Sequence, residues 1–383
     1  MVLLSFKFKI HIFIIMDKIK RFIDCYIPVT TCTLRCHYCY ITCHRLFEGR
    51  LPKFRYSPEQ VRKALSKERL GGTCLINMCA GGETLLAQEV VDYARVLLEE
   101  GHYVMIVTNA TVSKRFDEIA QFPSELTKRL FFKFSYHYLE LKEKNLLDVF
   151  FSNIKKVRDV GCSFTLELTP SDEAIPYIED IKKVAVENLG AIPHVTIARD
   201  EHNPAYLPIL TKLSHQDYEK IWGTFNSVMF NYKVSIFEKK RTEFCYAGDW
   251  SFYLNMLTGE MTQCYCSYIR QNIFEEPSKP INFLAIGHNC SEHHCYNGHA
   301  FLTLGNIPEL LSPTYAAIRN RITKDGSEWL KPEMKAFMST KLNESNDEYT
   351  DEQKCAVDKK IAQIKRNRII KNRIKTVIRK LKP

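Results

Sequence analysis

Short apolar runs alternate with segments of helical periodicity over the first half of the chain. Between the runs, apolar side chains recur every three or four positions, as over residues 86–100 and 145–160, which indicates amphipathic helices. This alternation predicts six strand–helix units, and hence a parallel sheet covered by helices that falls short of the eight units of a closed barrel. The runs with the length and composition of buried strands are residues 22–29, 74–80, 103–108, 131–136, 164–168 and 194–198.

The pattern changes in the second half of the chain. Residues 252–257 and 260–264 have the character of two short strands around Thr258 and Gly259, which predicts a β-hairpin. Beyond about residue 311 the sequence is polar and helical. We therefore divide the chain into an N-terminal extension (1–19), a partial barrel (20–200), an irregular connecting segment (201–243), a small hairpin domain (244–310) and a helical C-terminal region with a basic tail (311–383).

The first 15 residues are apolar with a few lysines and have some features of a secretory signal. No small-residue cleavage site follows them, and Met16 offers an alternative start. We interpret this stretch as a ragged or mis-assigned N-terminus rather than an export signal. The chain has no run of about 18 apolar residues, so the sequence predicts no membrane span and a cytoplasmic protein.

The formal net charge of +10 is concentrated at one end of the chain. Residues 359–383 hold eleven Lys or Arg and no Asp or Glu, which leaves a body with 43 basic and 44 acidic side chains. A neutral body argues against a general nucleic-acid-binding surface, and we predict no specific nucleic-acid partner.

Isoleucines in the basic tail recur at helical spacing, at positions 361, 364, 370 and 374. This pattern suits a solvated helix packed on the body. It also suits an interfacial helix that makes peripheral contact with anionic membrane lipid, or a docking arm for an acidic partner. The sequence leaves these three interpretations open.

The chain has 14 cysteines, many of them clustered at metal-ligand spacings, which favours ligands in a reducing compartment over disulfides. Cys25, Cys74, Cys79 and Cys162 lie outside the clusters in apolar runs, and we expect them to be small buried side chains. Cys355 also stands outside the clusters.

The first cysteine cluster has the spacing C-x3-C-x2-C at Cys32, Cys36 and Cys39. An iron–sulfur cluster takes four ligands, so three thiolates leave one iron open for another molecule. This spacing, with Tyr38 before the last cysteine, resembles the radical S-adenosylmethionine (SAM) enzymes. The resemblance implies an open partial barrel, with a [4Fe–4S] cluster whose open iron binds SAM. A zinc site completed by His37 or Cys43 is the alternative.

Other expected SAM contacts follow from the resemblance and fall at predicted strand ends, where ligands of parallel sheets bind. Gly81, Gly82 and Glu83 resemble the family's Gly-Gly-Glu motif, which holds the amino group of SAM; the next residue is Thr84 where the family usually has proline. By position, Asn109, Ser135 and Glu167 resemble residues that contact the ribose and carboxylate of SAM. A turn, a helix cap and hydrogen-bonded strand residues are the structural alternatives for these positions.

A second cysteine set begins with the spacing C-x13-G-x4-C at Cys245, Gly259 and Cys264. It resembles the opening of the SPASM and twitch extensions of this family. With Cys290 and Cys295 it would supply four ligands to an auxiliary [4Fe–4S] cluster, with Cys266 as a competitor for one place. Zinc is the alternative here also, with a histidine ligand from His288, His293, His294 or His299.

The resemblance implies an enzyme that cleaves SAM reductively and uses the 5'-deoxyadenosyl radical to abstract hydrogen from a peptide, a protein or a small molecule. A reductant such as flavodoxin or ferredoxin would supply the electron. Tyr136, His137 and Asp249 are candidates for acid–base work on the substrate, although a structural role is the simpler interpretation of each. The alternative function is a non-enzymatic iron–sulfur or zinc protein for electron transfer or binding.

Overall fold

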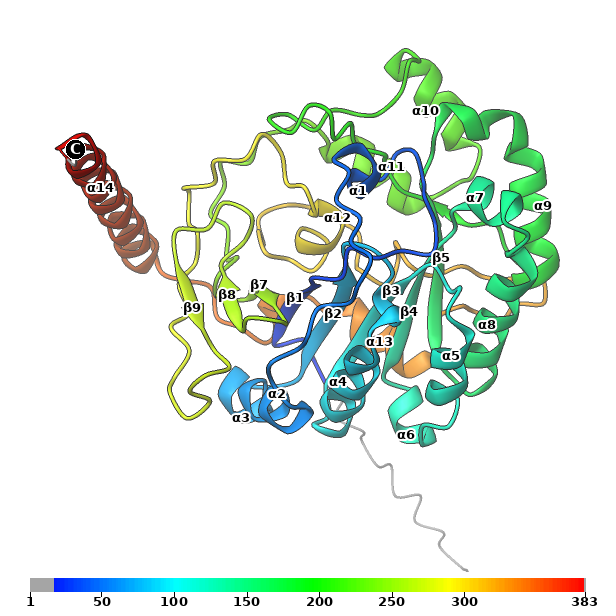
Figure 1. Cartoon of the computed structure of the whole chain (residues 1–383), viewed down its shortest axis with the longest axis horizontal. Helices are drawn as coiled ribbons and strands as arrows, with labels where there is room; N and C mark the ends of the chain where they lie inside the picture. The colour runs from blue at the N-terminus through cyan, green and yellow to red at the C-terminus, as the bar shows by residue number, and fades with distance from the viewer. Residues whose placement is uncertain (1–16, 382–383) are drawn as a thin grey trace, which may run out of the picture.

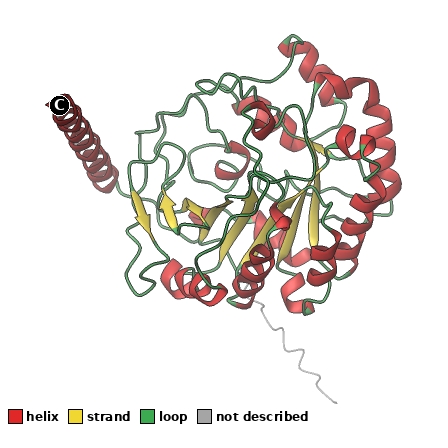
Figure 2. Cartoon of the chain, viewed as in Figure 1, coloured by secondary structure: helices red, strands yellow, loops and turns green. Residues whose placement is uncertain are grey.

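The computed structural model describes residues 17–381. Most of the predicted N-terminal extension, residues 1–16, lies outside the described residues. Within the described part, one sheet runs through the molecule with helices packed along one side of it (Figures 1 and 2). The order of strands in this sheet is β6-β5-β4-β3-β2-β1-β7-β8-β9.

Seven neighbouring strands of the sheet are parallel, and two antiparallel strands extend it beyond β7. The predicted parallel sheet of six strand–helix units is therefore confirmed, and the structure has the partial barrel of the predicted fold class. The strands are β1 (Arg21–Ile27), β2 (Cys74–Ala80), β3 (Tyr103–Thr108), β4 (Leu130–Ser135), β5 (Ser163–Leu168), β6 (His194–Val195), β7 (Ser251–Asn255), β8 (Glu260–Thr262) and β9 (Arg270–Asn272).

The helices along the outer face bury the apolar side chains of alternate strand positions. In β1, for example, Ile23, Cys25 and Ile27 belong to this core. The helices that connect the strands are α1 (Tyr40–Cys43), α2 (Pro58–Ala64), α3 (Lys67–Leu70), α4 (Gln88–Glu99), α5 (Ser113–Ile119), α6 (Ser124–Thr127), α7 (Tyr138–Glu143), α8 (Leu147–Asp159) and α9 (Ile178–Leu189), with short 3-10 turns at Thr84–Leu86 and Asp172–Tyr177.

The inner face of the sheet changes character along each strand. Near the strand starts, Phe22, Leu75 and Phe131 pack into a second apolar core with the C-terminal region. Further along the same faces the side chains are polar. The C-terminal half contributes α10 (His215–Gly223), α11 (Val228–Ile236), α12 (Gly298–Phe301), α13 (Pro332–Ser339), the turn Leu342–Glu344 and α14 (Asp351–Leu381).

Three features differ from the sequence prediction. Strand β6 has only two residues rather than five, and helix α11 was not predicted, because its apolar residues lack a one-sided helical pattern. The predicted hairpin is present as β7 and β8, with Gly259 at a φ of 71° in the turn. However, β7 also pairs in parallel with β1, so the hairpin continues the barrel sheet. A strand pairing between residues so far apart in sequence leaves no local signal.

The basic tail is helical, as predicted, but only its first turns pack on the body. Val357 and Ile361 are buried, whereas Ile370 and Ile374 are about half exposed, and α14 projects away from the molecule (Figure 1). No helix in the described residues is long and apolar enough to cross a bilayer.

Candidate functional site

The loop after β1 places three cysteines around one cavity of about 170 Å³ at the carboxyl end of the sheet. Strands β1, β2, β3 and β4 all end at this cavity, so the predicted motifs that follow them meet there. The predicted residues that line it are Cys32, Cys36, Cys39, Gly81, Gly82, Glu83, Asn109 and Ser135.

The Gly-Gly-Glu segment is tied to the cysteine loop through backbone atoms. The Gly82 N–H donates to the Val29 carbonyl at 2.6 Å, and the Glu83 N–H donates to the Thr31 carbonyl at 3.0 Å. A Cβ atom on Gly82 would lie 2.1 Å from the Thr31 carbonyl oxygen, so only glycine fits there. This close approach fixes the chain immediately before Cys32.

Glu83 is 1% exposed, and protein donors already surround its carboxylate. It accepts hydrogen bonds from the Thr108 hydroxyl at 2.6 Å, the Asn109 N–H at 2.8 Å and the Leu85 N–H at 2.9 Å. Burial raises its pKa, and these hydrogen bonds act in the opposite direction. Glu83 therefore joins the ends of β2 and β3, besides offering a carboxylate to the cavity.

Asn109 and Tyr38 are held in place beside the thiols. The Asn109 side-chain amide donates to the Thr33 hydroxyl at 2.9 Å and lies 3.6 Å from the Cys32 sulfur. The Tyr38 hydroxyl lies 2.8 Å from Nδ1 of His137, a residue that lines the cavity. Tyr38 itself stands next to the cavity but does not line it.

The thiols are suited to metal binding and poorly suited to remain charged alone. Burial raises the pKa of Cys32 to about 11 and also raises the pKa values of Cys36 and Cys39. Buried thiolates need a positive partner, which a metal cluster supplies. The proposed zinc ligands point elsewhere: His37 pairs with Glu173 at 2.9 Å, and the Cys43 sulfur lies 3.6 Å from the His37 carbonyl. This donor set fits a cluster with one iron free of protein ligands.

Glu167 does not join the other predicted residues. It is 3% exposed, and its carboxylate pairs with Lys133 at 3.1 Å and with Arg319. The prediction that it contacts SAM is therefore not supported by its position. Tyr136 and Asp249 are also engaged away from the cavity: Tyr136 packs among core aromatic rings, and Asp249 pairs with Arg21 at 3.1 Å.

The second cysteine set surrounds a small cavity of about 30 Å³. All five candidates line it: Cys245, Cys264, Cys266, Cys290 and Cys295. The sulfurs of Cys266 and Cys290 are 3.8 Å apart, so Cys266 stays a competitor for a ligand place. In the described part of the chain, no three His, Cys, Asp or Glu side chains converge on a point that a single metal ion could occupy.

The candidate histidines have different surroundings near this second cavity. His288 pairs with Asp358 at 2.8 Å, and the His293 ring lies 4.4 Å from that of Tyr206. His294 lines the second cavity, whereas His299 lines a different one.

Between the two cysteine cavities lies a space that we call the central chamber. It consists of two adjoining cavities of about 400 and 250 Å³ that share lining residues, including Asp24 and Arg199. Cys79 lines both parts of the chamber and the first cysteine cavity, while Tyr265 and Tyr296 line both parts and the second. A molecule in this chamber would therefore lie next to both sites.

Sequence reasoning missed the polar side chains of the chamber. Cys79 was expected to be a buried hydrophobe, but it is partly exposed to these cavities; Cys25, Cys74 and Cys162 are buried, as predicted. The available signal was a polar residue at an inward position of a buried strand, as at Asp24, Asn77 and Lys133.

Comparison with known proteins identifies the domain that carries the first site. Residues 26–169 match the family model of the Radical SAM superfamily, so this part of the chain is a radical SAM domain. The matched residues include the three cysteines, the Gly-Gly-Glu segment and the ends of β3, β4 and β5.

Two solved structures are similar to the chain as a whole. Streptococcus suis SuiB bound to S-adenosylmethionine is 14% identical with a TM-score of 0.47, over 68% of this chain and 64% of SuiB. Native anSMEcpe with bound AdoMet is 12% identical with a TM-score of 0.44, over 92% of this chain and all (100%) of anSMEcpe. The chain thus spans 64% of the length of SuiB. A search of curated proteins finds no match.

Proposed function

We propose that this chain is a radical SAM enzyme. The observation that carries the proposal is the cavity lined together by Cys32, Cys36, Cys39, the Gly-Gly-Glu segment and Asn109. The three thiolates would hold a [4Fe–4S] cluster, and SAM would occupy the adjoining space. When bound, the reduced cluster supplies the electron that splits SAM into methionine and a 5'-deoxyadenosyl radical, which abstracts hydrogen from the substrate.

The chain's own residues would bind and orient SAM and keep water away. Gly82 lets the backbone approach closely, and Glu83 offers a carboxylate to an ammonium group. Asn109 and Ser135 would supply hydrogen-bonding groups to the polar parts of SAM. The sheet and its helices bury this pocket, which protects a radical from solvent.

The second cysteine set would hold an auxiliary cluster of the SPASM or twitch type. We propose Cys245, Cys264, Cys290 and Cys295 as its ligands, with Cys266 as the alternative to one of them. The shared small cavity supports this proposal. A cluster there would border the chamber and could accept an electron from a substrate radical, which would make the net reaction an oxidation of a maturase or oxidoreductase type.

The substrate would bind in the central chamber, because that space adjoins both cysteine cavities. A segment of a peptide or protein and a small molecule are both compatible with its volume. The electron for SAM cleavage would come from a flavodoxin- or ferredoxin-like reductant.

Anaerobic reconstitution with iron and sulfide tests the proposal. The reconstituted chain should show sulfur-to-iron charge-transfer absorption and form 5'-deoxyadenosine from SAM and dithionite. Cys36→Ala should abolish this product, whereas Cys355→Ala, at an exposed position on α14, should retain it. A chain that binds zinc instead and forms no 5'-deoxyadenosine would be a non-enzymatic metal protein.

Iron analysis tests the auxiliary cluster separately. Cys264→Ala should lose the iron of one cluster while the first cluster remains, and a comparison of Cys266→Ala with Cys290→Ala should identify the fourth ligand. Equal iron content in wild type and Cys264→Ala would contradict the proposed ligand set.

A further inference from the structure

The deeper part of the central chamber has charged walls. It is lined by Lys133, Arg199 and Lys233 together with Asp24, from β4, the segment after β6, α11 and β1. Charged side chains are rarely placed inside a barrel unless they have partners or a ligand. The partner of each charge therefore indicates what the chamber is built to hold.

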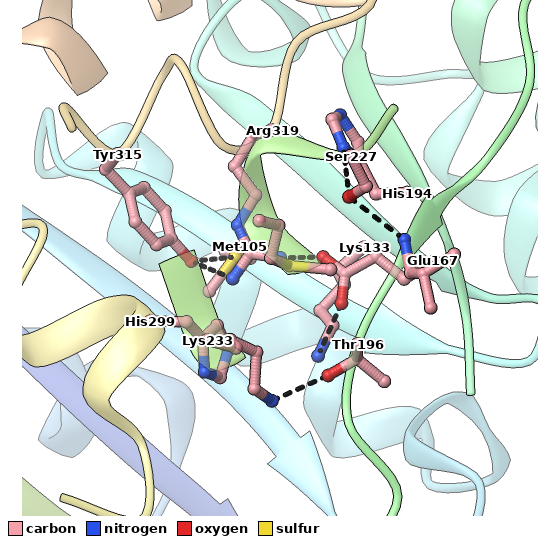
Figure 3. Close-up of polar contacts among 12 residues, drawn as sticks. Met105, Lys133, Glu167, His194, Thr196, Ser227, Lys233, His299, Tyr315 and Arg319 are labelled. Atoms are coloured by element: carbon pink, nitrogen blue, oxygen red, sulfur yellow. Dashed lines mark hydrogen bonds and ion pairs between the residues drawn. The ribbon is translucent and has the colours of Figure 1, made fainter. Parts of the chain in front are cut away.

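Two of the four charges are already satisfied by protein groups. Lys133 lies 3.1 Å from the Glu167 carboxylate, which also pairs with Arg319 behind the chamber wall (Figure 3). Asp24 accepts hydrogen bonds from the side-chain amides of Asn77 at 2.7 Å and Asn297 at 3.1 Å. Neither group requires a further charged partner.

The other two charges are cations with weak or no acidic partners. The Lys233 ammonium donates to the Thr196 hydroxyl at 2.7 Å (Figure 3), and no acidic side chain of the described residues lies within 4.0 Å of it. Arg199 lies 3.5 Å from Glu201, and the Arg199 side chain is 35% exposed. Burial beside Arg199 and Lys133 lowers the pKa of Lys233 well below its ordinary value, as expected for a cation without a counter-ion.

Hydrogen-bond donors surround these two cations. Tyr265 and Tyr296 line the same part of the chamber, as does His299, whose Nδ1 is buried without a hydrogen-bond partner among the described residues. Lysine, arginine and phenol groups together match the acceptor oxygens of an oxyanion.

We propose that the central chamber binds an oxyanion group of the substrate, a carboxylate or a phosphate, through Lys233 and Arg199. The designation of this anion as substrate rests on the proposed function; the existence of the anion site does not. The chamber shares only Cys79, Ala80 and Val107 with the first cysteine cavity, so this anion is distinct from the carboxylate of SAM.

Direct binding measurements on the reconstituted full chain test the site. Inorganic phosphate and malonate serve as probes in calorimetric titrations under anaerobic conditions at constant ionic strength. We expect saturable binding of at least one probe to the wild type, and the tighter probe indicates whether the substrate carries phosphate or carboxylate. Since a charge-assisted hydrogen bond is lost, Lys233→Met should bind it about tenfold to a hundredfold more weakly.

Matched variants separate this site from nonspecific charge effects. Lys220→Met, at an exposed position on α10, should bind like the wild type. Lys233→Arg should retain much of the affinity because the charge is kept. Arg199→Met gives an independent test at a partly exposed side chain if Lys233→Met fails to fold, and it should also weaken binding about tenfold.

Three results would overturn the inference: no saturable binding of either probe, equal binding by the wild type and the Lys233→Met and Arg199→Met variants, or displacement of the probe by SAM. These outcomes are independent of SAM cleavage. A wild type that binds the probe but forms no 5'-deoxyadenosine contradicts the proposed function, whereas one that forms 5'-deoxyadenosine without binding either probe contradicts the anion site.

Discussion

Replacement of Gly82 by alanine tests the contact that fixes the cysteine loop. The new Cβ would lie 2.1 Å from the Thr31 carbonyl oxygen and 2.7 Å from its carbon. Carbon and oxygen atoms normally approach to about 3.3 Å, so the two backbone segments must separate by roughly 1 Å. Because the clash is with backbone atoms, no side-chain rotation relieves it.

The magnitude follows from the hydrogen bonds that join these segments. A shift of this size disrupts the bond from the Gly82 N–H to Val29, at 2.6 Å, and the bond from the Glu83 N–H to Thr31, at 3.0 Å. With a net value of about 1 kcal/mol each, and about 1 to 3 kcal/mol for a buried group left unpaired, we expect a loss of about 2 to 4 kcal/mol in the free energy of unfolding. The entropy gain from replacing glycine, at most about 1 kcal/mol, is too small to offset it.

Urea unfolding of the purified chain measures this loss, and iron analysis after reconstitution measures its effect on the site. Since Thr31 precedes Cys32, the displaced loop should also bind less iron. The control is Gly49→Ala: a Cβ atom on Gly49 would have no heavy atom within 4 Å, and Gly49 has no positive φ, so the stability of this variant should stay within about 1 kcal/mol of wild type. If both variants unfold alike and bind the same iron, the close approach does not hold the loop.

Two further predictions concern stability. His102 is fully buried, with Nδ1 accepting from the Cys74 N–H at 3.1 Å, and burial lowers the pKa of His102 to about 4. The unfolded chain takes up the proton near pH 6.5, so the stabilisation is complete above that pH and is lost as pH falls toward 4; in urea titrations His102→Gln should lose about 2 kcal/mol less than wild type between about pH 7.5 and about pH 5. On α14, buried Ile361→Ala should cost about 2 to 5 kcal/mol, whereas Ile370→Ala, 48% exposed, should change the unfolding free energy by less than about 0.5 kcal/mol; equal losses would mean that the distal helix also packs on the body.

The barrel strands were predictable because each is a local pattern. Residues 74–80 and 103–108 have the same bounds in the sequence prediction and in the structure, since an uninterrupted apolar run specifies a buried parallel strand. The tail helix was also predictable from periodicity. Its extension away from the body was not, because a repeat of isoleucines does not state how many of them find a partner surface.

The first site was predictable for a similar reason. Its cysteines are close in sequence, and its other motifs follow successive strands whose carboxyl ends must meet at one edge of the sheet. The assignment of Glu167 failed to find support because its strand position allows two environments. Pairing with Lys133 and Arg319 depends on where residue 319 folds, which is far away in sequence.

The sequence by itself therefore determined the parallel sheet, the three thiols with no fourth, and the glycine-rich segment beside them, since each depends on neighbours in the chain or on strand order. Only the tertiary structure decided that β7 joins β1, that two cysteine cavities border one chamber, and that Lys233 and Arg199 face this chamber without a strong acidic partner. These features depend on contacts between distant segments, which side-chain packing selects and no local pattern encodes.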